Sequence, residues 1–74
     1  MSLLNENITE EIQKQIYVIT AKLGAPPVRV VVWGVHLQVN WIANDKSYMW
    51  RSDGRDWVEV YNNTEVWGIS IANL

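Results

Sequence analysis

Residues 28–41 read VRVVVWGVHLQVNW, a stretch in which valine or leucine recurs at every second position on either side of one glycine. Such alternation predicts two antiparallel strands with one buried side and one solvent-facing side. Glycine readily adopts the positive φ of a tight hairpin turn, so we expect a two-residue turn at Trp33-Gly34. This turn sets three apolar pairs opposite each other on the buried side: Val32 with Val35, Val30 with Leu37 and Val28 with Val39.

An amphipathic helix is predicted ahead of this hairpin, over residues 8–23. Asn7 can cap its start, and Gly24 followed by Pro26 ends it. We expect this helix to cover one open face or end of the sheet. Its apolar residues recur at intervals of three and four, the spacing of one helix face: Ile8, Ile12, Ile16, Ile19 and Leu23.

Further turn signals divide the rest of the chain into short strands. A two-residue turn at Asn44-Asp45 pairs Trp41 with Tyr48, and a turn with left-handed Gly54 sets Tyr48 opposite Val58. The fold class predicted for the single domain 1–74 is therefore mainly β, with one N-terminal helix and a five-stranded, strongly bent antiparallel sheet or small open barrel. We expect the bent sheet to close, because an open sheet would leave its edges exposed. The predicted strands are 28–33, 35–43, 47–51, 56–61 and 65–71, with the last turn at Asn62-Asn63-Thr64.

Composition excludes several classes of protein. A chain of 74 residues buries about 60% of its unfolded surface, so its five tryptophans and three tyrosines exceed what one small core needs. The absence of cysteine excludes disulfides and thiolate metal sites. A net charge of −2 argues against a general polyanion binder. No run is apolar enough for a membrane span or signal peptide, so we expect a soluble, cytoplasmic protein without a membrane partner.

Catalytic and cofactor chemistry find no support in the sequence. His36 is the only histidine and falls on the outward side of its strand, without a second metal ligand beside it. Asp45, Asp53 and Asp56 lie in turns and have no base or nucleophile at catalytic spacing. We therefore expect a non-enzyme without a cofactor or metal.

The order of elements, a helix and then five antiparallel strands, resembles the Sm/LSm family and in particular its Hfq-like branch. Residues 33–38, followed by Asp45, match the order and spacing of the first two strands of that branch. Residues 60–63 look like its loop before the last strand. The resemblance implies an Sm-like, SH3-like barrel that forms a cyclic homo-oligomer, in which 56–61 of one subunit pairs with 65–71 of the next.

The resemblance also implies that single-stranded RNA, or DNA, binds at pore loops and that the protein acts in RNA processing or regulation. Asparagine amides suit base edges and tyrosine suits base stacking, whereas the alternative role of an Asn in a tight loop is to bond the backbone. The basic pair of the family's second loop is replaced here by asparagines, so Lys46 and the arginines must attract phosphate. The expected nucleic-acid-binding residues are Asn44, Asp45, Lys46, Ser47, Tyr48, Tyr61, Asn62 and Asn63.

A protein-binding adaptor or inhibitor is the alternative function. On the predicted outward face of the sheet, Met49, Trp57 and Tyr61 accompany Arg51 and Glu59. These residue types are enriched in protein interfaces, and an exposed apolar patch of this kind marks a contact site.

Overall fold

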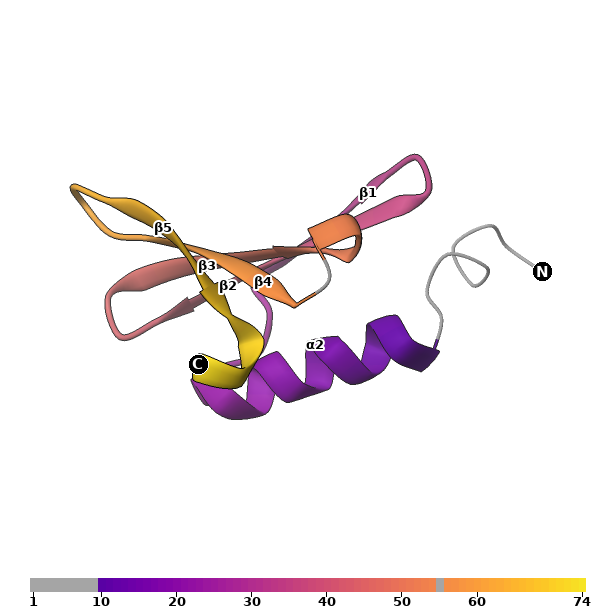
Figure 1. Ribbon diagram of the computed structural model, residues 1–74, viewed down its shortest axis with the longest axis horizontal. Helices are drawn as coiled ribbons and strands as arrows, with labels where there is room; N and C mark the ends of the chain where they lie inside the picture. The colour runs from indigo at the N-terminus through magenta and orange to yellow at the C-terminus, as the bar shows by residue number, and fades with distance from the viewer. Residues whose placement is uncertain (1–9, 55) are drawn as a thin grey trace.

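The computed structural model describes residues 10–54 and 56–74, which form one helix followed by five antiparallel strands (Figure 1). This confirms the predicted fold class, and each strand begins and ends within one residue of its predicted bounds. The predicted helix start at residue 8 and its cap Asn7 lie outside the described residues. The elements are α2 Glu10–Leu23, β1 Arg29–Trp33, β2 His36–Ala43, β3 Lys46–Arg51, β4 Trp57–Tyr61 and β5 Val66–Ser70, with 3-10 turns η1 Ser52–Gly54 and η2 Ile71–Asn73.

Helix α2 carries the charges that suit its dipole and ends at a glycine. Glu10 and Glu11 occupy its first turn and Lys22 its last. Gly24 has φ 69°, and its N–H donates to the carbonyl of Thr20 at 2.9 Å, which closes the helix in the left-handed conformation that glycine tolerates.

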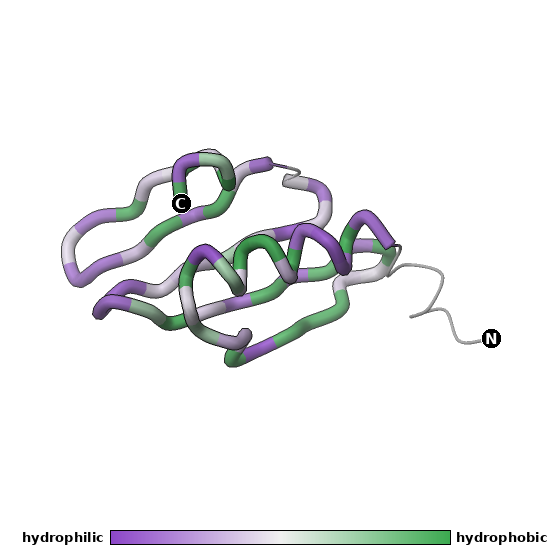
Figure 2. Tube along the Cα trace, turned by 90° about the horizontal axis from the view of Figure 1, so that it is seen from below, coloured by the Kyte–Doolittle hydropathy of each residue, from purple (hydrophilic) through white to green (hydrophobic). Residues whose placement is uncertain are grey.

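The sheet is an open meander in the order β1-β2-β3-β4-β5. The predicted closure into a barrel is therefore wrong, because β1 and β5 do not pair and each leaves one edge open. Helix α2 lies across one face of the sheet (Figure 2), and Ile19 of the helix and Ile71 of η2 are buried in the common core. These two elements bury the inner face of the central strands without barrel closure.

The core lies between α2 and the inner face of β2, β3 and β4. Inside it, the indole Nε1 of Trp41 donates to Thr20 Oγ1 at 3.0 Å, which joins helix and sheet by one polar contact. The buried residues are Ile19, Leu37, Val39, Trp41, Tyr48, Trp50, Val58, Val60 and Ile71.

The first hairpin turns one residue later than predicted. Its turn is Gly34-Val35, and the observed register sets Val32 opposite Leu37 rather than Val35. Gly34 has φ 59°, so it occupies the first central position of the turn, where a type II′ turn requires glycine. The predicted turn would have placed Trp33 there, and a bulky residue avoids positive φ.

The second hairpin has the predicted register, and the third does not. Trp41 pairs with Tyr48, around a turn in which Asn44 and Asp45 both have positive φ. In the third hairpin Tyr48 lies opposite Val60 instead of Val58, because residues 52–54 form a 3-10 turn in which Gly54 lacks the left-handed conformation.

Each shift moves the register by two residues, so the inward and outward faces remain as predicted. What the sequence pattern did not predict is the exposure of β1. Val30 and Val32 lie on the inner face, opposite Val39 and Leu37, yet they are 55% and 47% exposed, and Val28, just before β1, is 58% exposed. The core covers the inner face of the sheet from β2 onward and leaves that of β1 open.

Candidate functional site

The two predicted binding loops lie at the same end of the sheet. The β2–β3 turn and the β4–β5 turn project together, opposite the β1–β2 turn (Figure 1). They are adjacent because β3 pairs with β4, which sets Ser47 beside Tyr61.

The predicted residues nevertheless divide between the two faces of the sheet. Lys46 and Tyr48 share the inner face with the core, and Tyr48 is only 7% exposed. Ser47 and Tyr61 lie on the opposite, outer face. A strand alternates its side chains, so consecutive residues of the 44–48 segment cannot contact one ligand from the same side of the sheet.

The β4–β5 turn uses Asn62 to hold its own backbone. Asn62 Oδ1 accepts from the N–H of Glu65 at 2.7 Å and from the N–H of Thr64 at 2.9 Å. The N–H of Asn62 also donates to the carbonyl of Glu65 at 3.0 Å. This side-chain oxygen therefore stabilises the turn, while Asn63 is exposed at its tip.

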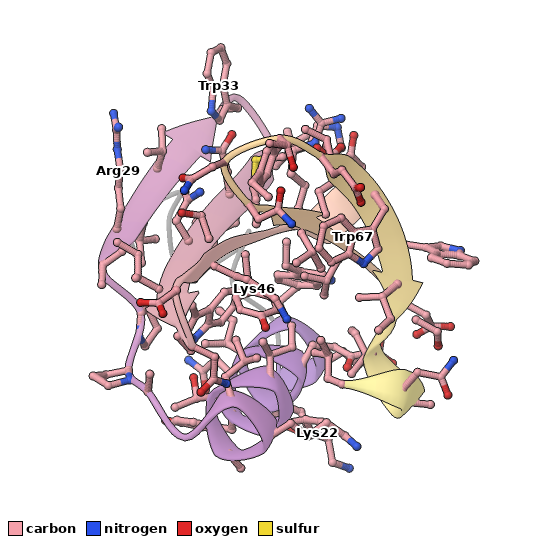
Figure 3. All side chains as sticks on the ribbon, turned by 90° about the vertical axis from the view of Figure 1, so that its left-hand side faces the viewer. Lys22, Arg29, Trp33, Lys46 and Trp67 are labelled. Atoms are coloured by element: carbon pink, nitrogen blue, oxygen red, sulfur yellow. The ribbon has the colours of Figure 1, made fainter. Side chains whose placement is uncertain are left out.

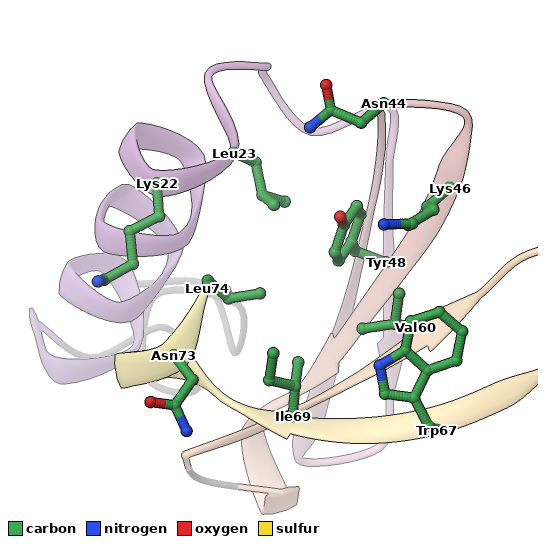
Figure 4. A pocket seen from close by; sticks show the side chains of 10 residues that line it. All are labelled: Lys22, Leu23, Asn44, Lys46, Tyr48, Val60, Trp67, Ile69, Asn73 and Leu74. Carbon is green, nitrogen blue, oxygen red and sulfur yellow. The ribbon is translucent and has the colours of Figure 1, made fainter.

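An open pocket of about 190 Å³ lies at the turn end of the core, between α2, β3 and β5. Leu23, Ile69 and Leu74 point into the gap, and Lys46 reaches across from β3 (Figure 4). Three predicted site residues line this pocket, namely Asn44, Lys46 and Tyr48. Its interior is mainly apolar, with one ammonium and one amide on the β3 side.

The outer face of the sheet is defined as the side away from α2. It carries a further set of exposed aromatic and aliphatic side chains. One row crosses four strands, because Ile42 is opposite Ser47, Ser47 opposite Tyr61 and Tyr61 opposite Val66. The exposed large side chains on this face are Trp33 at 63%, Ile42 at 58%, Trp57 at 61% and Val66 at 63%.

The residues of the predicted protein-contact patch lie on the outer face, in this row and the two next to it. Met49 lies opposite both Asn40 and Glu59, and the strand pattern places Arg51 and Trp57 on the same side. Trp57 also covers the neighbouring strand, since a Cβ built at Gly68 would lie 3.7 Å from its ring.

Two polar contacts hold side chains on and beside the outer face. Arg51 Nε lies 3.3 Å from Asp53 Oδ1, and the Tyr61 hydroxyl donates to Glu59 Oε2. The hydrogen bond to Glu59, aided by partial burial and the carboxylate charge, raises the pKa of Tyr61 above its usual value of 10.0, while nearby Arg51 opposes the shift. Tyr61 is therefore held neutral and oriented at neutral pH.

Sequence reasoning missed Ile42, Val66 and Trp33 as candidate site residues. All three were assigned only to strands or turns, although their outward positions follow from the same alternation that defined the core. His36, predicted to be solvated, is exposed.

Within residues 10–54 and 56–74, no three potential ligands gather into a metal site. In the same part of the chain, no helix has the length and apolarity needed to cross a membrane. Comparison of the chain with family models, curated proteins and solved structures gave no match.

Proposed function

We propose that this chain is a protein-binding module that recognises its partner through the outer face of the sheet. The observation that carries the proposal is the exposure of four large hydrophobic side chains on this one face, Trp33, Ile42, Trp57 and Val66. Exposed apolar residues scattered singly need no explanation. Here Ile42 and Val66 end one row that also carries Tyr61, and Met49 and Trp57 lie on the same face, so we infer that these side chains together mark the interaction site.

The dimensions of the face suit a small interface. Strands lie about 4.8 Å apart, so the row from β2 to β5 is roughly 14 Å wide. Three side-chain rows along the strands add roughly 14 Å in the other direction. With the side chains at its margin, the face measures a few hundred Å², the size of functional patches on small proteins, and its apolar side chains are interspersed with polar ones such as Ser47, Asn40 and Glu59.

The residue types also favour a protein partner. Tryptophan, tyrosine, methionine and arginine are enriched in interfaces, and the first two dominate their binding energy. Arg51 and Tyr61 are already positioned by Asp53 and Glu59, which limits the side-chain entropy lost on binding. The same carboxylates offset the positive charge that a nucleic-acid backbone would require.

RNA binding at the two loops, and ring assembly through 56–61 and 65–71, stay predictions. The division of the loop residues between two faces, and the use of Asn62 within its own turn, are the reasons why we place the functional surface on the outer face instead.

The test begins with a photo-crosslinking amino acid at Trp57, produced in the cells from which the chain comes. A crosslinked protein is identified by mass spectrometry, purified, and titrated with the wild type, Trp57→Ala and Tyr17→Ala. Tyr17 is the matched control because it is 70% exposed but lies on α2. We expect Trp57→Ala to weaken binding of the partner at least tenfold, which corresponds to a loss of about 1.4 kcal/mol in binding free energy. Tyr17→Ala should leave the affinity unchanged.

A second arm titrates oligo-U and oligo-A RNA at two salt concentrations. The proposal is overturned if either oligonucleotide binds and Trp57→Ala abolishes that binding, because the outer face would then be a nucleic-acid surface. Equal effects of Trp57→Ala and Tyr17→Ala on the crosslinked partner would also contradict it.

A further inference from the structure

Strand β1 is largely apolar, and within residues 10–54 and 56–74 no other strand pairs with its outer edge. Its inner side carries Val30 and Val32, its outer side carries Trp33 at the turn, and Val28 directly precedes it. All four side chains are exposed. Figure 2 shows this run as a nearly continuous hydrophobic segment at the sheet margin. A hydrophobic edge strand left open in this way invites pairing with another strand.

The main-chain groups of β1 are available for that pairing. Trp33 and His36 flank the two-residue turn and so form a hydrogen-bonded pair, and such pairs alternate along an antiparallel hairpin. Trp33, Val31 and Arg29 therefore bond to β2, while the N–H and C=O groups of Val30 and Val32 are directed to the open edge.

The five residues of β1, RVVVW, are complementary to a second antiparallel copy of themselves. With Val31 opposite Val31 of the second copy, Val30 faces Val32 of that copy in a hydrogen-bonded pair, and both open-edge residues are used. Arg29 then faces Trp33 of the second copy in a non-hydrogen-bonded pair, in which side chains approach most closely. Guanidinium and indole attract each other in this arrangement.

We propose that the protein forms a twofold-symmetric dimer by antiparallel pairing of β1 with β1 of a second copy, centred on Val31. The two sheets join into one of ten strands, and on the inner face Val30 and Val32 of each copy lie beside Val32 and Val30 of the other. Each dimer has two Arg29–Trp33 contacts across the twofold axis. Figure 3 shows the side chains of Arg29 and Trp33 on β1, both pointing away from α2.

Charge selects this register over its neighbours. Pairing centred on Arg29 would oppose two like charges, which destabilises a strand pair. Pairing centred on Val30 sets Arg29 opposite Val31 and gains no contact for the cation. The register centred on Val31 separates the two Arg29 residues by four positions, or roughly 14 Å.

The other open edge, that of β5, is less suited to self-pairing. Gly68 lies at the middle of β5, and a glycine there has no side chain to contribute to a strand pair. The inner-face residues Trp67 and Ile69 already pack against the core. Strand β1 has the larger uncovered apolar surface.

The dimer shares Trp33 with the proposed partner-binding face, but the two proposals are tested separately, because Trp57 lies on β4, three strands from β1. Light scattering on the wild-type chain at increasing concentration should report twice the 8.6 kDa mass of one chain. Val30→Pro removes an N–H directed to the open edge and keeps the bonds of β1 to β2. We expect this variant to be monomeric, with an unchanged far-ultraviolet circular dichroism spectrum.

Single-cysteine variants test the register, since the chain has no cysteine of its own. In Val31→Cys the two introduced thiols face each other at a Cα separation of about 4.5 Å, which a disulfide can bridge. In Val30→Cys the thiols are diagonal neighbours at about 7–8 Å, beyond easy reach. Ile42→Cys, exposed on the same outer face but on β2, is the control for random collision.

At micromolar protein concentration, we expect Val31→Cys to form its intermolecular disulfide on the order of a hundredfold faster than Ile42→Cys, because pairing gives a millimolar effective concentration. Faster crosslinking of Val30→Cys than of Val31→Cys would overturn the register. A wild-type mass that stays monomeric at all concentrations, or that corresponds to a larger ring, would overturn the dimer itself. If Val30→Pro fails to fold, the wild-type mass and the crosslinking rates still test the dimer.

Discussion

Removing the hydroxyl of Thr20 tests the polar contact that joins helix to sheet. The Trp41 indole is 0% exposed and donates to Thr20 Oγ1 at 3.0 Å. Thr20→Val keeps the shape of the side chain and leaves this N–H without its acceptor. An unsatisfied buried donor costs about 1–3 kcal/mol. Since Thr20 itself is only half-buried, water can reach part of the site, and we expect a loss of about 1–2 kcal/mol.

A double-mutant cycle with Trp41→Phe separates the hydrogen bond from the packing. Trp41→Phe removes the donor together with buried ring volume, so it should destabilise the protein by more than Thr20→Val does. The coupling free energy between the two changes should be about 1 kcal/mol. Thr20→Ser, which keeps the hydroxyl, is the control and should retain that coupling.

Urea unfolding measures these differences at one fixed protein concentration, because self-association makes apparent stability depend on concentration. If Thr20→Val is as stable as wild type and the coupling is below about 0.3 kcal/mol, which is the usual error of additivity, the contact does not stabilise the fold. The helix would then be held by apolar burial and by the exposed contact of Gln15 Nε2 with Asp56 Oδ1.

Two further predictions concern the sheet. Leu37→Ala should lower the free energy of unfolding by about 2–5 kcal/mol because Leu37 is buried, whereas exposed His36→Ala should change it by less than about 0.5 kcal/mol; equal losses in urea unfolding would contradict the face assignment. Glu59→Gln should lower the pKa of Tyr61 from its raised value by weakening its hydrogen bond and removing a charge, as followed by NMR of ring-labelled tyrosine. Because the folded-state pKa is raised, the stabilisation from this contact is present below pH 10 and is lost as pH rises through that pKa; an unchanged pKa in Glu59→Gln would contradict this origin of the shift.

The two faces of the sheet assign different roles to residues that are neighbours in sequence. Tyr48 belongs to the core and Ser47 to the outer face, although both were predicted to bind the same ligand. Tyr61, in contrast, lies on the outer face, as strand alternation predicts. A predicted loop site therefore has to be tested against strand alternation before its residues are grouped.

Register was predictable only where local turn chemistry specified it. The Asn44-Asp45 turn was placed correctly because Asn and Asp tolerate the positive φ that both positions adopt. At the first hairpin, the alternating valines allow two registers that differ by two residues and have identical faces. Only the position of Gly34 within the turn distinguishes between them.

The third hairpin depended on a contact that local sequence does not contain. Ser52 Oγ accepts from the N–H of Leu37 at 2.9 Å, across 15 positions of the chain. This bond occupies the donor of Leu37 at the point where β3 ends, and it accompanies a 3-10 turn where a three-residue hairpin loop was predicted. Turn propensities describe only neighbouring residues, so they could not reveal it.

The sequence by itself determined the helix, the number of strands and the inward or outward side of each strand residue, because these follow from periods of 3.6 and 2 in hydrophobicity. Only the tertiary structure decided how far the core extends. Helix α2 covers the inner face of the central strands and leaves the valines of β1 exposed, so the sheet stays open instead of closing on itself. Local periodicity predicts which side chains face the inner side of the sheet. The direction of helix α2 across the sheet decides which of these side chains are buried within a single chain.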